Sequence, residues 1–312
     1  MNKKNLFQLM AILLVSILSV GFTACSSDDD DNPSEEQSQS TTGIKALTSD
    51  KAPALGWNGD SQNGILTFAE EPWETDEGNI QPYYAFEFSN AQCNEAVYDI
   101  VFPSVQLAQK FEAICKDGTW AEDIDDDDDY APLRKAIKPI LTRAQTINYK
   151  DLSLPAKRNG KVVYFLMDTF KKKSAADIKL LINYWCDVNA NMPNKVICGT
   201  WDAAKGKYNN NNVFGVGIVY DIKATFENDY LTKLTGTMTC PNATWARLMY
   251  EVVEDVNDEV SGFSGLSTEV KLNGKTITEE ANVEPGMIPR AYVEQMMYVY
   301  DVNYSYPVFC FF

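Results

Sequence analysis

The chain has 312 residues, with 27 Lys and Arg against 44 Asp and Glu, a formal net charge of −17 and no histidine. The missing histidine excludes Ser-His-Asp and Cys-His catalytic sets, histidine-ligated metals and histidine pH switches. The acidity argues against nucleic acid as a partner, because such binding needs clustered Lys and Arg. The 45% hydrophobic content is typical of a chain with a packed core.

Residues 1–24 have the order of features found in an export signal. Lys3 and Lys4 precede an apolar run, 6–20, that is short for a membrane span. The run is followed by the sequence GFTAC at 21–25, which resembles a bacterial lipobox, where small residues precede a cysteine that receives lipid. The resemblance implies that Cys25 becomes the lipidated N-terminus and anchors the protein to a membrane.

The residues after Cys25 are polar and acidic. The sequence SSDDDD at 26–31 resembles the acidic export tag of Bacteroidetes lipoproteins that reach the cell surface. This resemblance implies a lipid-anchored location on the outer membrane, exposed at the surface, and it implies no activity. Residues 25–43 contain almost nothing apolar and predict a flexible tether, so the globular region is expected over 44–312.

In the first half of the globular region, period-two alternation predicts a strand over 84–88 and a neighbouring strand over 97–102. Helical periodicity follows over 107–115, with Ser104 as the N-cap. A second helix is expected over 133–144, kinked at Pro139. A continuous apolar run over 162–167 predicts a central strand, and a third helix is expected over 178–185 behind Ser174.

In the second half, alternation predicts a strand over 216–226 and helical periodicity predicts a helix over 245–256, capped by Asn242. A hairpin over 270–277 is expected to turn at Asn273-Gly274 with type I′ geometry. Alternating tyrosines predict a long C-terminal strand over 292–302.

These elements favour the α+β class, with largely antiparallel sheet and about four amphipathic helices. A strand–Pro–cap–helix arrangement occurs twice, and aligning Pro103 with Pro241 also matches Ala108 with Ala246 and Asp117 with Asp255. The pattern suggests two similar lobes, although three identities do not distinguish duplication from chance. A lobe boundary is then expected in the Asn-rich stretch 189–212.

Six cysteines remain once Cys25 is assigned to lipid, an even number that permits three disulfides in an exported chain. Proximity in the sequence favours the pairs Cys93–Cys115, Cys186–Cys198 and Cys240–Cys310. The alternative is that several are reduced and buried as small hydrophobic residues.

The acidic run over 122–129 places alternate carboxylates at Asp123, Asp125, Asp127 and Asp129, which could coordinate Ca²⁺. The EF-hand pattern fails, because Tyr130 stands where the loop needs glycine. The alternative is a solvated acidic loop, and no other cofactor is expected.

Aromatic residues suggest a glycan-binding surface, because aromatic faces stack on sugar rings. The candidates are Trp57 and Trp73, expected on loops, and Tyr298 and Tyr300, expected on the C-terminal strand. The alternative for each is ordinary packing.

No complete enzyme motif is present, so the sequence favours a binding protein for a glycan or another extracellular ligand. Two alternatives stay open. One is a histidine-free hydrolase that uses a pair of Asp or Glu side chains. The other is a structural or adhesive component that engages other surface proteins.

Overall fold

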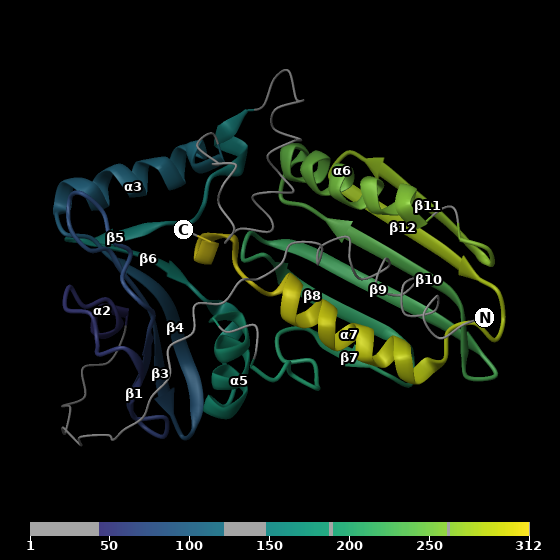
Figure 1. The fold of residues 1–312 in the computed structure, drawn as a ribbon, viewed down its shortest axis with the longest axis horizontal. Helices are drawn as coiled ribbons and strands as arrows, with labels where there is room; N and C mark the ends of the chain where they lie inside the picture. Colours follow the sequence, from purple (N-terminus) through teal and green to yellow (C-terminus); the bar gives the residue numbers. More distant parts are fainter. Residues whose placement is uncertain (1–43, 122–147, 187–189, 261–262, 312) are drawn as a thin grey trace. The chain divides into compact units, whose positions relative to one another are not determined.

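The computed structural model describes residues 44–121, 148–186, 190–260 and 263–311 (Figure 1). These residues form two compact units. Of the described residues, the N-terminal unit holds those up to Trp120 and from Ser153 to Asn191, and the C-terminal unit holds Ala121, 148–152 and those from Met192 onward. The predicted lipidation site Cys25, the tether, the acidic run and the helix over 133–144 lie outside the described residues.

The N-terminal unit is built on a six-stranded antiparallel sheet of order β1-β2-β3-β4-β6-β5. Its strands are β1 (Gly56–Gly59), β2 (Ile65–Ala69), β3 (Gln81–Ser89), β4 (Gln92–Val101), β5 (Lys157–Asn159) and β6 (Val162–Leu166). Its helices are α2 (Ile44–Leu47), α3 (Val105–Asp117) and α5 (Ala175–Cys186), with short 3₁₀ turns η1 (Thr119–Ala121) after α3 and η3 (Asp168–Phe170) after β6.

The C-terminal unit is built on a second six-stranded antiparallel sheet, of order β7-β8-β9-β10-β12-β11. Its strands are β7 (Thr200–Asp202), β8 (Lys207–Val213), β9 (Ile218–Glu227), β10 (Tyr230–Thr239), β11 (Leu266–Asn273) and β12 (Thr276–Val283). Its helices are α6 (Ala243–Val260) and α7 (Arg290–Tyr304), with 3₁₀ turns η2 (Tyr149–Leu152) and η4 (Val308–Phe311).

Both units follow one plan: a meander of four strands, a helix, a hairpin and a second helix. In each unit the second strand of the hairpin returns to pair with the fourth strand of the meander, β6 with β4 and β12 with β10. The prediction of an α+β fold with antiparallel sheet and two similar lobes is confirmed.

The turns repeat as well as the topology. The β3–β4 and β9–β10 hairpins each turn on two residues with positive φ, Asn90-Ala91 and Asn228-Asp229, as a type I′ turn requires. The hairpins after the first helix each turn on Gly-Lys within the sequence Asn-Gly-Lys, at 159–161 and 273–275. The glycines have φ values of +58° and +61°.

The predicted type I′ turn at Asn273-Gly274 is therefore wrong in detail. Asn273 pairs with Thr276, so the two turn residues are Gly274 and Lys275. A positive φ at the first position alone is the pattern of a type II′ turn, which favours glycine at that position.

A β-bulge also recurs at the same place. The register shifts between Cys93 and Glu95 on β4 and between Leu231 and Lys233 on β10. In each unit the residue before the bulge donates its backbone N–H to the loop that precedes the second helix. Cys93 N donates to Lys173 O at 3.0 Å, and Leu231 N donates to Ile288 O at 2.8 Å.

The strand–Pro–cap–helix arrangement is the same in the two units. Ser104 Oγ accepts from Leu107 N at 3.2 Å and Asn242 Oδ1 accepts from Trp245 N at 2.9 Å, which confirms both predicted N-caps. Ala108 and Ala246, at equivalent helix positions, are both 0% exposed. With the turns and bulges, these matches describe two copies of one structural module.

The two long helices of each unit, α3 and α5 in one and α6 and α7 in the other, cover one face of its sheet. In the N-terminal unit Phe86 packs edge-on against Phe170, which in turn contacts Trp185 of α5. In the C-terminal unit α6 packs over β11 and β12, and Tyr304 of α7 packs against Tyr220 of β9. These helix-covered faces hold most of the aromatic core.

The predicted C-terminal strand over 292–302 is wrong, because Arg290–Tyr304 is the helix α7. Alternation of Tyr298 and Tyr300 suggested a strand, but the buried positions Val293, Met297, Tyr300 and Tyr304 recur every three or four residues. That spacing is the period of a helix with one face on a sheet. The run over 162–167 does form β6, although β6 is next to the sheet edge and not central.

The predicted disulfides are not supported, since no two of the described cysteines lie at disulfide distance. Cys93, Cys115 and Cys240 are buried, and burial raises the pKa of each thiol to about 12. Cys186 and Cys198 belong to different units. Cys93, Cys115 and Cys240 fit the alternative prediction better, in which reduced cysteines are buried as small hydrophobic residues.

We expect thiol titration of the Cys25→Ala chain, unfolded without reductant, to find all six remaining thiols. Buried thiols react only after unfolding, so the folded chain should react more slowly. A count of zero would show that the three disulfides form after all.

Candidate functional site

One face of the C-terminal sheet, the face that the helices do not cover, carries mostly polar side chains. We call it the open face. Side chains alternate along β9 between buried residues and the exposed Asp221, Lys223 and Thr225. The open face is formed by outward-pointing residues of the sheet: Asn209, Asp221, Lys223, Thr225, Lys233, Thr235, Thr237, Thr239, Thr276, Thr278, Glu280, Asn282, Ser267, Glu269 and Lys271.

Strand pairing arranges these side chains in rows that run across the sheet. One row passes through five adjacent strands as Asn209, Asp221, Thr237, Thr278 and Lys271. Neighbouring strands lie roughly 4.8 Å apart, so the row presents hydroxyl, amide and charged groups at regular intervals over about 19 Å. The row therefore offers alternating donors and acceptors to an extended polar ligand.

The charges of the open face are balanced and paired. Lys233 Nζ lies 2.7 Å from Glu280 Oε1, and Lys271 Nζ lies 2.8 Å from Glu269 Oε1. Asn209 Nδ2 donates to Asp221 Oδ1 at 2.9 Å. These exposed pairs add little stability, but they hold polar groups in place on a rigid sheet without giving the face a strong net charge.

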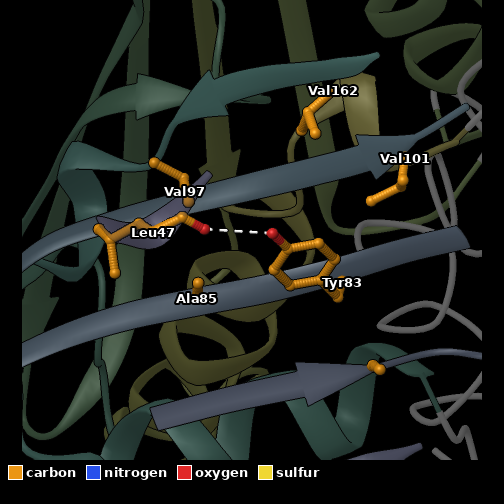
Figure 2. Close-up of a cluster of buried hydrophobic side chains, with 7 residues drawn as sticks. Leu47, Tyr83, Ala85, Val97, Val101 and Val162 are labelled. Carbon is orange, nitrogen blue, oxygen red and sulfur yellow. Dashed lines mark hydrogen bonds between the residues drawn. The ribbon is translucent and has the colours of Figure 1, made fainter. Parts of the chain in front are cut away.

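The equivalent face of the N-terminal sheet, on the side away from α5, carries mostly apolar side chains and is covered. A cluster of buried residues lies on it, formed by Leu47, Ala69, Tyr83, Ala85, Val97, Val101 and Val162 (Figure 2). Leu47 belongs to the segment 44–52, and Ala52 packs on the same cluster. Two copies of one module thus differ in their second face, which is occupied in one and open in the other.

The helix-covered face of the C-terminal unit contains a carboxyl group among tyrosines. The Tyr220 hydroxyl lies 3.3 and 3.4 Å from the two oxygens of Glu279. Tyr220 packs edge-on against Tyr304, which stacks on Tyr300. Burial raises the pKa of Glu279 to about 7, and the hydrogen bond from Tyr220 opposes part of that rise.

Gly236 lies opposite Glu279 on β10, and its lack of a side chain leaves room for the Tyr220 ring and the Glu279 carboxyl. A Cβ at Gly236 would lie 3.1 Å from the Tyr220 hydroxyl oxygen and 3.4 Å from the Glu279 carboxyl carbon. The equivalent position in the N-terminal unit is Tyr98, which pairs with Tyr84.

The N-terminal unit has its own buried carboxyl, Glu70, just after β2. Burial raises the pKa of Glu70 to about 7, and Tyr98 lowers it in part. Its Oε1 is enclosed and has no hydrogen-bond partner. For both Glu70 and Glu279, burial is the larger cause of the shift and one tyrosine opposes it.

A third polar cluster is structural. The Asp301 carboxylate of α7 accepts backbone N–H groups from Ile197 at 2.6 Å, Cys198 at 2.8 Å and Gly199 at 2.5 Å. It also accepts from the Tyr208 hydroxyl at 3.1 Å. These bonds satisfy the charge and fix the chain that leads into β7, so Asp301 has no capacity left for a ligand.

The predicted ligand residues Trp57 and Trp73 do not lie on the open face. Trp57 lies on β1, packs against Phe68, donates from Nε1 to Asn183 Oδ1 at 2.7 Å and lies beneath Lys179 Nζ at 5.3 Å. Both sides of its ring are therefore in contact with protein. Trp73 forms an isolated bridge with Ile80 and is half-buried.

Tyr298 and Tyr300 lie on α7, so they point in different directions and form no shared strand face. Tyr300 is 8% exposed and stacks on Tyr304 in the core, whereas Tyr298 is half-buried. Trp57 and Trp73 thus belong to the N-terminal unit, and Tyr298 and Tyr300 to the C-terminal unit.

The proposed calcium ligands Asp123, Asp125, Asp127 and Asp129 lie outside the described residues. Among the residues that the structure does describe, no group of three or more Cys, Asp and Glu could hold a metal ion. The calcium site therefore stays a prediction.

The open face was not predicted from the sequence, although a signal was present. Thr235, Thr237 and Thr239 alternate with Leu234, Gly236 and Met238, as expected for a strand with one wet face. The partner threonines Thr276 and Thr278 lie about forty residues later in the chain. Only the pairing of β10 with β12 places the two sets side by side.

No protein-family model matches the chain, and no curated protein or solved structure is significantly similar to it. The functional argument therefore rests on the chain's own residues. Within the described part, no helix is both long and apolar enough to cross a bilayer.

We expect the Glu279→Gln variant to flatten the pH dependence of stability. Glu279 has a pKa of about 7 in the folded chain against an ordinary value of 4.5, so the folded chain binds this proton more tightly. The stability it contributes is complete below about pH 4.5 and is lost as the pH rises through about 7. Urea unfolding at pH 5 and pH 8 measures the difference.

The neighbouring Glu280 is the matched control, because it points to the open face and its bond to Lys233 lowers its pKa. Glu280→Gln should therefore leave the loss of stability above pH 5 in place. Equal curves for the wild type and Glu279→Gln would show that Glu279 is not buried as described.

Proposed function

We propose that this chain is a lipid-anchored protein of the bacterial outer surface that binds a glycan through the open face of its C-terminal unit. The observation that carries the proposal is the difference between the two modules. The N-terminal module uses its second sheet face for packing, with Tyr83, Val97 and Val101 in the cluster. The C-terminal module presents Asp221, Thr237 and other polar side chains there.

A glycan fits the open face because the face offers hydrogen bonds in place of apolar contact. Thr237 pairs with Thr278 and Thr239 with Thr276, so four hydroxyls lie together on two strands. Each hydroxyl can donate and accept, as can the hydroxyls of a sugar. The balanced charge favours a neutral or weakly charged chain of sugars over a strongly charged polymer.

The alternatives receive less support. The carboxyls of Glu70 and Glu279 are buried, which disfavours a hydrolase built on either of them, because a substrate must reach the catalytic acid. The large exposed apolar residues of the described chain, such as Leu55, Met192 and Leu272, lie on different elements and not in the open face. This scatter disfavours a partner protein that docks through a broad apolar patch.

A glycan array probed with the Cys25→Ala chain tests the proposal, followed by calorimetry on the best ligand. Thr237→Val and Asp221→Asn should each weaken binding at least about fivefold, since each removes hydrogen bonds that contribute about 1 kcal/mol. Asp117→Asn, the same change of side chain at an exposed position on α3 of the other unit, should leave binding unchanged.

Thermal unfolding should confirm that the variants remain folded. No signal on the array, or equal loss in the Asp117→Asn control, would overturn the glycan assignment. Release of reducing ends from the bound glycan would favour the hydrolase alternative.

The location is tested separately on intact cells. Proteinase added outside should digest the wild-type chain, whereas Cys25→Ala should leave the membrane fraction, because one or more acyl chains on Cys25 provide the attachment. Complete protection of the wild type would contradict surface exposure.

A further inference from the structure

The segment 44–52, which we call the strap, is the first part of the chain that the structure describes, directly after the predicted tether. It crosses the second face of the N-terminal sheet and is held by a small number of contacts. Leu47 is 2% exposed in the apolar cluster, and Ala52 packs beside it. The strap includes the single helical turn α2 and has no strand pairing.

Tyr83 provides the main polar contact to the strap. Its hydroxyl lies 3.2 Å from Leu47 O (Figure 2). It also lies 3.1 Å from Ser49 O and accepts from Ser49 N at 3.0 Å. Asn159, in the β5–β6 hairpin, adds contacts to Thr48 at 3.3 and 3.5 Å. The strap is therefore attached mainly at one phenol and one leucine.

Asp99 lies on the face that the strap covers. It is the register partner of Tyr83 on β3 and of Tyr164 on β6, and it stands between Val97 and Val101 on β4. Its side chain is 0% exposed, and neither carboxyl oxygen has a hydrogen-bond partner. The Tyr83 hydroxyl is close enough to offset part of the rise that burial causes in the pKa of Asp99, and its bonds of 3.0 to 3.2 Å go to the strap.

A carboxyl in this position is stable only when it is neutral, because an unpaired charge in an apolar site is very costly. Burial accordingly raises the pKa of Asp99 well above its ordinary range. Ionisation needs water at the carboxylate, and Leu47 and Ala52 of the strap pack on the cluster that includes Val97 and Val101, the residues on either side of Asp99 on this face. Proton loss and strap opening are therefore linked.

The charged and titratable groups around Asp99 do not provide a positive charge that pairs with its carboxylate. Those facing it from the neighbouring strands are Tyr83 and Tyr164, which are phenols. The strap itself brings Lys45, Asp50 and Lys51, and Lys157 lies on β5 opposite Tyr164. Among the described residues, none of these lysines forms an ion pair with Asp99.

The C-terminal module shows the same pair of positions without a strap. There the partners equivalent to Tyr83 and Asp99 are Asp221 and Thr237, on the open face. In that module the carboxyl at this face, Asp221, is exposed to water. An acid buried at this face is thus found in the strapped copy and not in the other.

We propose that the strap is a proton-controlled latch: it stays closed over Asp99 while this carboxyl is protonated and opens when the proton is lost. Opening frees nine further residues, 44–52, which extends the link between the membrane anchor and the folded unit by about 30 Å. The latch would let the pH outside the cell set how far the protein reaches. This reach depends on the predicted tether, whereas the latch itself does not.

Hydrogen exchange of the full Cys25→Ala chain, followed by mass spectrometry between pH 5 and pH 9, tests the latch. After correction for intrinsic rates, exchange of the peptide 44–52 should rise with pH by up to about tenfold per unit, the limit for one proton. Exchange of β6 should not change in parallel, because the opening is local.

Three variants separate the latch from general destabilisation. Asp99→Asn keeps the shape but cannot ionise, so the strap should stay protected across the range. Tyr83→Phe removes the hydroxyl contacts, so the strap should exchange faster at every pH. Asp76→Asn, an exposed loop change in the same unit, should behave as the wild type does.

Three results would overturn the proposal. One is strap exchange that does not depend on pH in the wild type. Another is an equal pH dependence in Asp99→Asn. If β6 loses protection together with the strap, the transition is unfolding of the whole unit, and the latch is likewise refuted.

Discussion

Each unit depends on the return of a hairpin to the strand that precedes the helix. Phe102 N donates to Lys161 O and Cys240 N donates to Lys275 O, both at 2.9 Å, so the ladder is extended by one bond at the same point of each module. That bond joins the chain entering the helix to the turn of the hairpin. It fixes the register in which β6 meets β4 and β12 meets β10, and a slip of one residue would move every side chain to the opposite face.

With that register, two helices pack on one face of the sheet in each module. The topology that the two modules share does not cover the second face. The two copies use this freedom differently. Tyr83 and Asp99 in the first copy are matched by Asp221 and Thr237 in the second, so a packed face and a wet face arise from the same backbone. Two similar modules can in this way differ in what their second face contacts.

The buried acids illustrate why a raised pKa does not by itself define an active site. Glu70 and Glu279 have pKa values of about 7, and Asp99 is also shifted upward, in each case mainly by burial. Catalysis would require a partner group and access for a substrate. Glu279 instead hydrogen-bonds one tyrosine beneath the helices, and Asp99 lies beneath the strap. Asp221, Lys223 and the other polar side chains of the open face, in contrast, do face water.

The sequence by itself determined the elements whose signals are local. Ser104 and Asn242 cap their helices, the run over 216–226 forms β9, and the class is α+β. Local signals failed at α7, because a tyrosine alternation over a few residues fits a strand as well as a helix until the core selects a face. The open face, the strap over Asp99 and the hairpin return were decided only by the tertiary structure. Each joins residues far apart in the chain, such as Thr237 with Thr278 and Leu47 with Tyr83, and a periodic pattern describes one element without naming its neighbour.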